Sequence, residues 1–142
     1  MTVRYLLDTN ILSYFIRGGN AALHDRMSQE LAHQTVATSA ICRAELRFGQ
    51  SELAAQDKRH RMIDLCLLQV PALPWTEAMA DVYGPLAQTL RQQGRPIGAM
   101  DTLIAAHALT EGLVLVTHNI RHFEGVEGVE GLKLENWAAL QT

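Results

Sequence analysis

Three carboxylates in this chain stand where its apolar pattern predicts burial. Asp8 directly follows the short apolar run at 3–7. Glu45 and Asp101 fall on stripes with the three- and four-residue spacing of a buried helix face, made of Ile41, Ala44 and Phe48 and of Ile97, Ile104 and Ala108. Burying an unpaired carboxylate costs several kcal/mol unless something compensates its charge. A shared divalent cation would do so, which makes a metal-dependent hydrolase the first hypothesis.

Each of these acids also has an ordinary structural alternative. Asp8 could simply cap the helix that follows it, and Asp101 could cap a helix or pair with a cation. Glu45 could pair with Arg43 or Arg47 on a solvated helix face. A common site is favoured over three separate explanations because three carboxylates of one chain stand where the apolar pattern predicts burial.

Composition indicates one globular domain over residues 1–142. The chain is 48% hydrophobic and 19% charged with a net charge of −3, so it can form a core but has no basic field for coating nucleic acid. A nuclease stays compatible, because a few arginines can hold phosphates around an acidic centre. Cys42 and Cys66 have no disulfide or metal-site spacing, as is typical of reduced core cysteines. Without a signal-peptide pattern or an apolar run near the roughly 18 residues of a membrane span, we expect a cytoplasmic protein with no membrane partner.

Short apolar runs alternate with helical patterns along the chain. Strands are expected at 3–7, 35–38, 70–73, 113–116 and 132–134, with 70–73 at an edge because of its proline. Helices are expected at 9–16, 20–33, 55–68 and 76–93, from a cap at Ser39 to about Gln50, and around Asp101 as far as Gly112. After a helical turn through Phe123, the Glu-Gly-Val tandem at 124–131 is expected to be a solvated loop. The order predicts an α/β fold, a three-layer α/β/α sandwich with a short, mostly parallel central sheet.

The carboxyl edge of such a sheet is where ligands bind. Asp8 ends the first strand, and Thr117-His118-Asn119 follows the strand at 113–116. Glu45 and Asp101 can reach the same edge from the starts of their helices. We therefore expect polar groups from four parts of the chain to converge there.

The motifs at these positions occur in a characteristic order. They are Leu6-Leu7-Asp8-Thr9-Asn10, Ala44-Glu45-Leu46, the segment 98–105 around Asp101, Val116-Thr117-His118-Asn119 and the ending Glu135-Asn136-Trp137. The ordered set resembles a PIN domain, and most of all the VapC toxins of bacterial type II toxin–antitoxin modules, over the whole chain. The resemblance implies a single PIN domain that acts as a Mg²⁺-dependent endoribonuclease, with Mn²⁺ able to substitute. It also implies a growth-arresting toxin that forms a homodimer and is neutralised by a VapB-type antitoxin.

Residue roles follow from the resemblance. Asp8, Glu45 and Asp101 match the acidic metal-site positions, and Asn119 stands where the family commonly has a fourth acid. Asp8 and Asp101 are expected to bind the metal directly, while Glu45 could bind it, hold water or act as a base. Hydrogen bonds that orient the carboxylates are expected from Thr9, Asn10 and Thr117. The candidate substrate contacts are His118, Arg95, Arg121 and Arg43, with Arg17 and Arg47 as further arginines. Taken singly, such residues are more often ordinary surface or loop residues.

Two other functions compete with RNA cleavage. One is a PIN-like module that binds RNA or protein without catalysis. The other is a small-molecule phosphatase, although a haloacid-dehalogenase type would need a second Asp where this chain has Asn10. Resemblance to VapC proteins with Thr-His-Asn favours the anticodon loop of initiator tRNA as the substrate and leaves ribosomal RNA open.

Two further expectations concern packing. His107 lies in an apolar helix and is expected to be a hydrogen-bonded core residue. A homodimer is expected to bury apolar surface on the helices at 55–68 and 76–93, the second through Met79, Val82, Tyr83, Leu86 and Leu90.

Overall fold

A five-stranded parallel sheet forms the centre of the computed structural model, which describes residues 2–138. Its order is β3-β2-β1-β4-β5, and every neighbouring pair runs parallel. The strands are β1 (Tyr5–Leu7), β2 (Val36–Ser39), β3 (Ala72–Leu73), β4 (Val114–Val116) and β5 (Leu134–Glu135). The helices are α1 (Thr9–Arg17), α2 (Ala21–Ala32), α3 (Ala40–Ser51), α4 (Arg59–Gln69), α5 (Glu77–Gln92), α6 (Ala99–Glu111) and α7 (Ile120–Glu130). The expected α/β architecture is confirmed, with a sheet that is parallel throughout.

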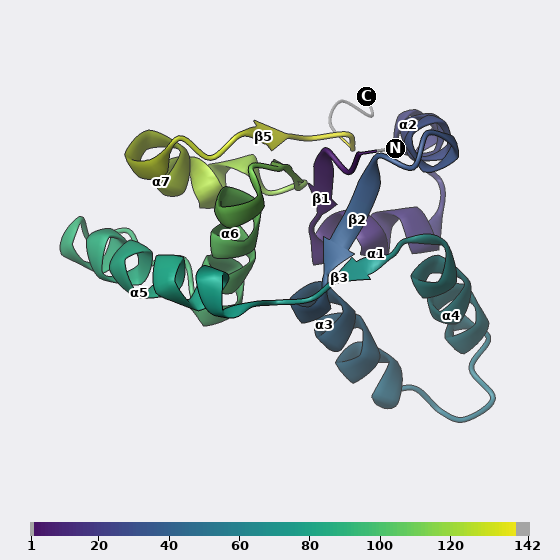
Figure 1. Ribbon diagram of the computed structural model, residues 1–142. Coiled ribbons are helices and arrows are strands. Elements are labelled where there is room, and N and C mark those ends of the chain that lie inside the picture. Colours follow the sequence, from purple (N-terminus) through teal and green to yellow (C-terminus); the bar gives the residue numbers. More distant parts are fainter. Residues whose placement is uncertain (1, 139–142) are drawn as a thin grey trace.

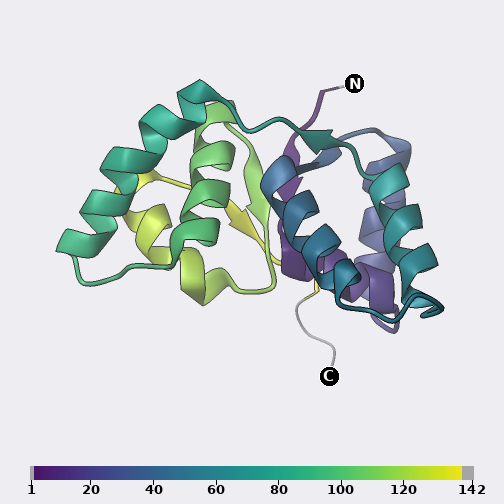
Figure 2. The ribbon, with the colours of Figure 1, turned by 90° about the horizontal axis from the view of Figure 1, so that it is seen from below.

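Two groups of helices flank the sheet. Helices α1 to α4 pack on one side, and α5, α6 and α7 pack together on the other, as Figures 1 and 2 show. Strands β1 and β2 are buried along their whole length, which is the usual result when a parallel sheet is covered on both faces. Within residues 2–138, no helix is long and apolar enough to cross a membrane.

Several local predictions are confirmed. Ser39 caps α3 by accepting a hydrogen bond from the Ile41 amide, and Gly112 ends α6 in the left-handed conformation with φ 65°. Strand β3 lies at the edge, as the proline beside it predicted. Cys42 and Cys66 are both buried and free of disulfides. The tail after Ala138 lies outside the described residues.

The prediction of a loop at 124–131 is wrong. These residues continue α7 as far as Glu130, and Gly131 ends the helix in the left-handed conformation. The three-residue tandem places Phe123 and Val126 on one helix face, and both are buried. Gly125 lies beside Arg95, where an added Cβ would be 3.4 Å from the Arg95 Nε, an ordinary van der Waals distance.

Helices α3 and α4 differ from prediction in their buried faces and boundaries. The core face of α3 is formed by Cys42 and Leu46, whereas Phe48 is 68% exposed, so the premise that Glu45 shares a buried stripe with Phe48 is wrong. Helix α4 begins at Arg59 instead of residue 55, after a turn in which Asp57 accepts a hydrogen bond from the Arg59 amide.

The apolar stripe on α5 belongs mainly to the core. Met79, Leu86 and Leu90 are each 1% exposed, so they leave little surface for a second subunit. Helix α4 instead exposes large apolar side chains to solvent, namely Met62, Leu65 and Leu68.

Candidate active site

The site lies where the strand order changes direction. From β1, strands β2 and β3 extend to one side and β4 and β5 to the other. Leu7 pairs with Val116 at the carboxyl ends of β1 and β4, and the Asp8 amide donates to the Val116 carbonyl oxygen at 2.9 Å. Asp8 and Thr117 therefore leave the sheet side by side, at the crevice where parallel α/β sheets bind ligands.

Asp8 is a buried carboxylate held from two directions. It occupies the N-cap position of α1, where its Oδ1 accepts from the Thr9 amide at 2.7 Å. Its Oδ2 accepts from the Thr117 hydroxyl at 2.9 Å. Burial raises the pKa of Asp8 to about 6, the bonds from Thr117 and Thr9 oppose that rise, and the negative charges of Asp101 and Glu45 add to it. The carboxylate is thus both a helix cap and a member of an acidic cluster.

Glu45 reaches the site from the second turn of α3. The Thr9 hydroxyl donates to Glu45 Oε1 at 2.7 Å and so connects this acid to the residue next to Asp8. The bond fixes one carboxylate oxygen and leaves Oε2 as the second acceptor. Thr9 therefore contacts both of these acids, through its amide and its hydroxyl.

Asp101 enters from the first turn of α6, where the helix dipole favours a negative charge. His122 of α7 contacts this acid, since its Nε2 lies 2.8 Å from Asp101 Oδ2 and 2.8 Å from the Ile97 carbonyl oxygen. Both partners are acceptors, so Nε2 carries the hydrogen and donates to them. Sequence reasoning missed His122, which lies in the expected helical turn through Phe123, because its contact with Asp101 depends on how α7 packs against α6.

A polar network joins the ends of β1 and β4. Asn10 Oδ1 accepts from the His118 amide at 3.0 Å, and Thr117 Oγ1 accepts from the Asn119 amide at 3.1 Å. The Asn119 side chain is exposed and makes no cap bond to α7. Asn10 and Thr117 therefore order the loop after β4, while Asn119 is brought near the network through its backbone.

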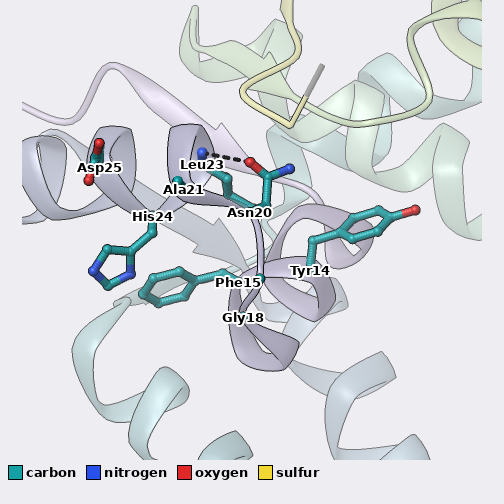
Figure 3. Close-up of a pocket in the computed structure, with 9 residues that line it drawn as sticks. Tyr14, Phe15, Gly18, Asn20, Ala21, Leu23, His24 and Asp25 are labelled. Carbon is teal, nitrogen blue, oxygen red and sulfur yellow. Dashed lines mark hydrogen bonds between the residues drawn. The ribbon is translucent and has the colours of Figure 1, made fainter. Parts of the chain in front are cut away.

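All three acids line one open pocket of about 490 Å³. Its lining is Asp8, Thr9, Asn10, Ser13, Tyr14, Arg17, Glu45 and Asp101. Ser13 and Tyr14 were not predicted as site residues, although their spacing from Asn10 and Arg17 marks one face of α1. A second cavity of about 380 Å³ lies beside the pocket and shares Tyr14 with it (Figure 3).

Of the candidate arginines, the structure places only Arg17 in the lining of this pocket. Arg43 donates to the Leu67 carbonyl oxygen, and Arg47 pairs with Asp64. Arg95 packs against Gly125, and Arg121 is exposed outside the lining.

The donor set of the pocket suits a hard divalent cation. Carboxylate oxygens are the ligands that Mg²⁺ and Mn²⁺ prefer, and the raised pKa of Asp8 shows that negative charge there lacks full compensation. Among residues 2–138, no three acidic, histidine or cysteine side chains are gathered tightly enough to enclose an ion alone. Mg²⁺ keeps several waters and takes only one or two carboxylates directly, so it would not need such an enclosure. Asp8 and Asp101 are the residues that would hold it, with Glu45 alongside.

His107 has a separate place in the core. It is fully buried, and its Nδ1 lies 2.9 Å from the Ser39 hydroxyl oxygen, while its Nε2 has no partner among the described residues. Burial lowers the pKa of His107, so the ring is neutral at physiological pH. The expected hydrogen-bonded core histidine is confirmed.

Comparison with known proteins agrees with this geometry. Residues 5–128 match the PIN domain family. The chain is 36% identical over 126 residues to ribonuclease VapC1 of Haemophilus influenzae, covering 89% of this chain and 94% of the relative. It is 31% identical to the tRNA(fMet)-specific endonuclease VapC of Shigella flexneri, covering 96% and 99%. The solved VapBC2 complex of Rickettsia felis, bound to a promoter DNA fragment, superposes with a TM-score of 0.84 at 33% identity, covering 96% and 99%. The chain belongs to the PIN-domain family, among the VapC ribonuclease toxins of VapBC toxin–antitoxin systems.

Proposed function

We propose that this protein is a Mg²⁺-dependent endoribonuclease that cleaves structured RNA and thereby inhibits translation and growth in the cytoplasm. The observation that carries the proposal is the convergence of Asp8, Glu45 and Asp101 in one open pocket. Three separate elements supply these acids, and no binding-only module needs a partly desolvated acidic cluster at its centre. In this proposal the whole chain acts as one PIN domain.

Each acid has a distinct task in the proposed reaction. When bound, Mg²⁺ would lower the pKa of the attacking water and neutralise negative charge at the scissile phosphate. Asp8 and Asp101 hold the cation, and their positions are fixed by the bonds from Thr117 and His122. Glu45 Oε2, the oxygen not occupied by Thr9, accepts a proton from the attacking water.

The preferred substrate is initiator tRNA, cut in its anticodon loop. Support comes from the relative of Shigella flexneri that is named a tRNA(fMet)-specific endonuclease, at 31% identity. Mapping the 5′ ends of cleaved RNAs after brief induction, in cells lacking the antitoxin, tests this choice. Cleavage confined to ribosomal RNA would refute the tRNA assignment and leave the nuclease assignment intact.

Two assemblies belong to the same proposal. A VapB-type antitoxin neutralises the enzyme with a segment that lies across the acidic pocket, in keeping with the VapBC complexes among its solved relatives. The free toxin forms a homodimer. The apolar side chains on α4, 42% exposed for Met62 and 82% for Leu68, offer more surface for that contact than the buried stripe of α5.

The decisive experiment compares RNA cleavage by the purified protein and by Asp8→Asn, Glu45→Gln and Asp101→Asn, with Mg²⁺ and with EDTA. We expect each substitution to lower kcat by at least about 100-fold, because it removes a group that acts on the metal or the water. Asp81→Asn, an exposed acid on α5, is the matched control and should cleave normally. Full activity in a folded Asp8→Asn protein, or unchanged cleavage in EDTA, would refute the proposal.

A further inference from the structure

Arg17 is the positive group in the wall of the acidic pocket. It ends α1, and its guanidinium carbon lies 4.4 Å from the centre of the Tyr14 ring. Among the described residues, Arg17 forms neither an ion pair nor a side-chain hydrogen bond. Its donors are therefore available to a ligand, although three carboxylates line the same pocket.

Tyr14 restrains this arginine. A guanidinium held against an aromatic face gains cation–π attraction and keeps its planar fork in one orientation. The other neighbour of the tyrosine ring is His118, whose imidazole meets it edge-on at 4.8 Å between centroids. The His118 backbone is itself held by Asn10. Tyr14 is thus fixed between its own helix and the loop after β4.

Tyr14 lies in the wall shared by the acidic pocket and the neighbouring cavity, and its ring points away from the other aromatic residues of that cavity. Figure 3 shows its ring projecting away from Phe15 and His24, which approach each other with centroids 6.2 Å apart. Tyr14 also lines the acidic pocket together with Arg17. The tyrosine therefore places the arginine at the pocket that holds the acids.

We propose that Arg17, positioned by Tyr14, binds a backbone phosphate of the RNA as it enters the acidic pocket. The inference rests on the proposed nuclease function and adds a residue that contacts substrate. An RNA phosphate approaching Asp8, Glu45 and Asp101 meets like charge, and Arg17 is the one arginine in the pocket lining that can offset it. Guanidinium donors match phosphate oxygens in a two-pronged geometry that lysine cannot reproduce.

A structural alternative gives different results. Arg17 lies in the last turn of α1, where a cation stabilises the helix dipole. If that were its whole role, Arg17→Ala would lower the melting temperature and leave RNA binding unchanged. Arg17→Lys would behave like the unmodified protein, since it keeps the charge at the helix end.

The test measures RNA binding and cleavage with two probes, a fluorescent initiator-tRNA anticodon stem–loop and a mixed-sequence single-stranded RNA. Binding is followed by anisotropy in EDTA across a salt series, so that the RNA is not cut. We expect Arg17→Ala to weaken binding of both probes about tenfold and to reduce the slope of log affinity against log salt by about 0.7. Equal weakening on both probes is expected because a phosphate contact reads no sequence.

Tyr14 variants test the positioning. Tyr14→Phe retains the ring and should bind like the unmodified protein, whereas Tyr14→Leu should lose about threefold in affinity and keep most of the salt slope. Tyr14→Leu combined with Arg17→Ala should be no worse than Arg17→Ala alone, because the tyrosine acts through the arginine. Arg91→Ala, an exposed arginine on α5, is the control.

Cleavage in Mg²⁺ separates this inference from the proposed function. We expect Arg17→Ala to raise KM with kcat nearly unchanged, as for a contact made equally in ground and transition states. Unchanged KM, affinity and salt slope in Arg17→Ala, with cleavage still abolished in Asp8→Asn, would overturn the role of Arg17 alone. If the unmodified protein cuts no RNA, the proposed function fails, and the anisotropy series still decides whether Arg17 binds phosphate.

Discussion

Replacing the buried Asp8 with asparagine should stabilise the protein when no metal is bound. Burial raises the pKa of Asp8 from 3.8 to about 6, with a further contribution from the charges of Asp101 and Glu45. The folded state then binds the Asp8 proton more tightly than the unfolded chain does. Stability therefore falls as the pH rises from about 4 to about 6, and above pH ~7 the ionised carboxylate costs the folded state about 3 kcal/mol.

Asparagine fits the same position with small losses. Its oxygen can still accept from the Thr9 amide, and the Thr117 hydroxyl can rotate to accept from the new amide group. The loss of charge-assisted bonding costs about 1 kcal/mol. The expected net gain is about 2 kcal/mol at neutral pH, or a rise of roughly 4–8 °C in melting temperature for a chain of this size.

Urea unfolding followed by circular dichroism at pH 7.5 and pH 4, in EDTA and at one protein concentration, measures the effect. The gain should be present at pH 7.5 and largely absent at pH 4, where folded Asp8 is protonated. Asp81→Asn, which removes an exposed acid, should change neither value. Adding Mn²⁺ should stabilise the unmodified protein more than Asp8→Asn. A loss of stability at pH 7.5, or an equal gain at both pH values, would refute the reasoning.

Three further outcomes follow from side-chain positions. Leu86→Glu should unfold the chain because Leu86 is 1% exposed, whereas Leu68→Glu, at a position 82% exposed, should keep the circular dichroism spectrum and convert a dimer to monomer in light scattering. Asn119→Asp should leave the calorimetric affinity for Mn²⁺ unchanged, since this exposed side chain lies outside the pocket lining; a clear rise in affinity would contradict that placement. His122→Leu should lower kcat about 10- to 100-fold by releasing Asp101, and His122→Gln, which retains a donor, should restore most of it.

The sheet and its acidic edge could be predicted from local patterns. Short apolar runs such as 3–7 mark buried parallel strands, and topology then requires residues at their carboxyl ends to converge. Asp8 and Thr117 could be assigned to the site without further information, because each directly follows a strand. Glu45 was singled out for a wrong reason, since the apolar stripe that drew attention to it includes the exposed Phe48.

The rest depends on how helices pack. Residues 124–130 continue α7 because Val126 joins Phe123 on a buried face, and that burial is not visible in a run of Glu, Gly and Val. The contact of His122 with Asp101 depends on how α7 packs against α6, which the sequence alone does not show. The place of Arg17 on Tyr14 depends on side-chain conformation, which spacing does not determine.

The buried bond between Ser39 and His107 explains why two acids on different helices reach the same pocket. Ser39 precedes Glu45 by six residues, and His107 follows Asp101 by six, so each acid lies about 9 Å along its helix from the bond. Figure 1 shows α3 continuing beyond the end of β2 while α6 runs in the opposite direction, so the two acids lie on the same side of that bond. The repulsion between the acids would separate the helices if only exposed contacts joined them. A fully buried hydrogen bond resists such sliding, because breaking it leaves the buried imidazole of His107 without a partner among the described residues, while Ser39 keeps its bond from the Ile41 amide. The register of the acidic pocket is therefore fixed in the core, away from the solvent that the substrate must displace.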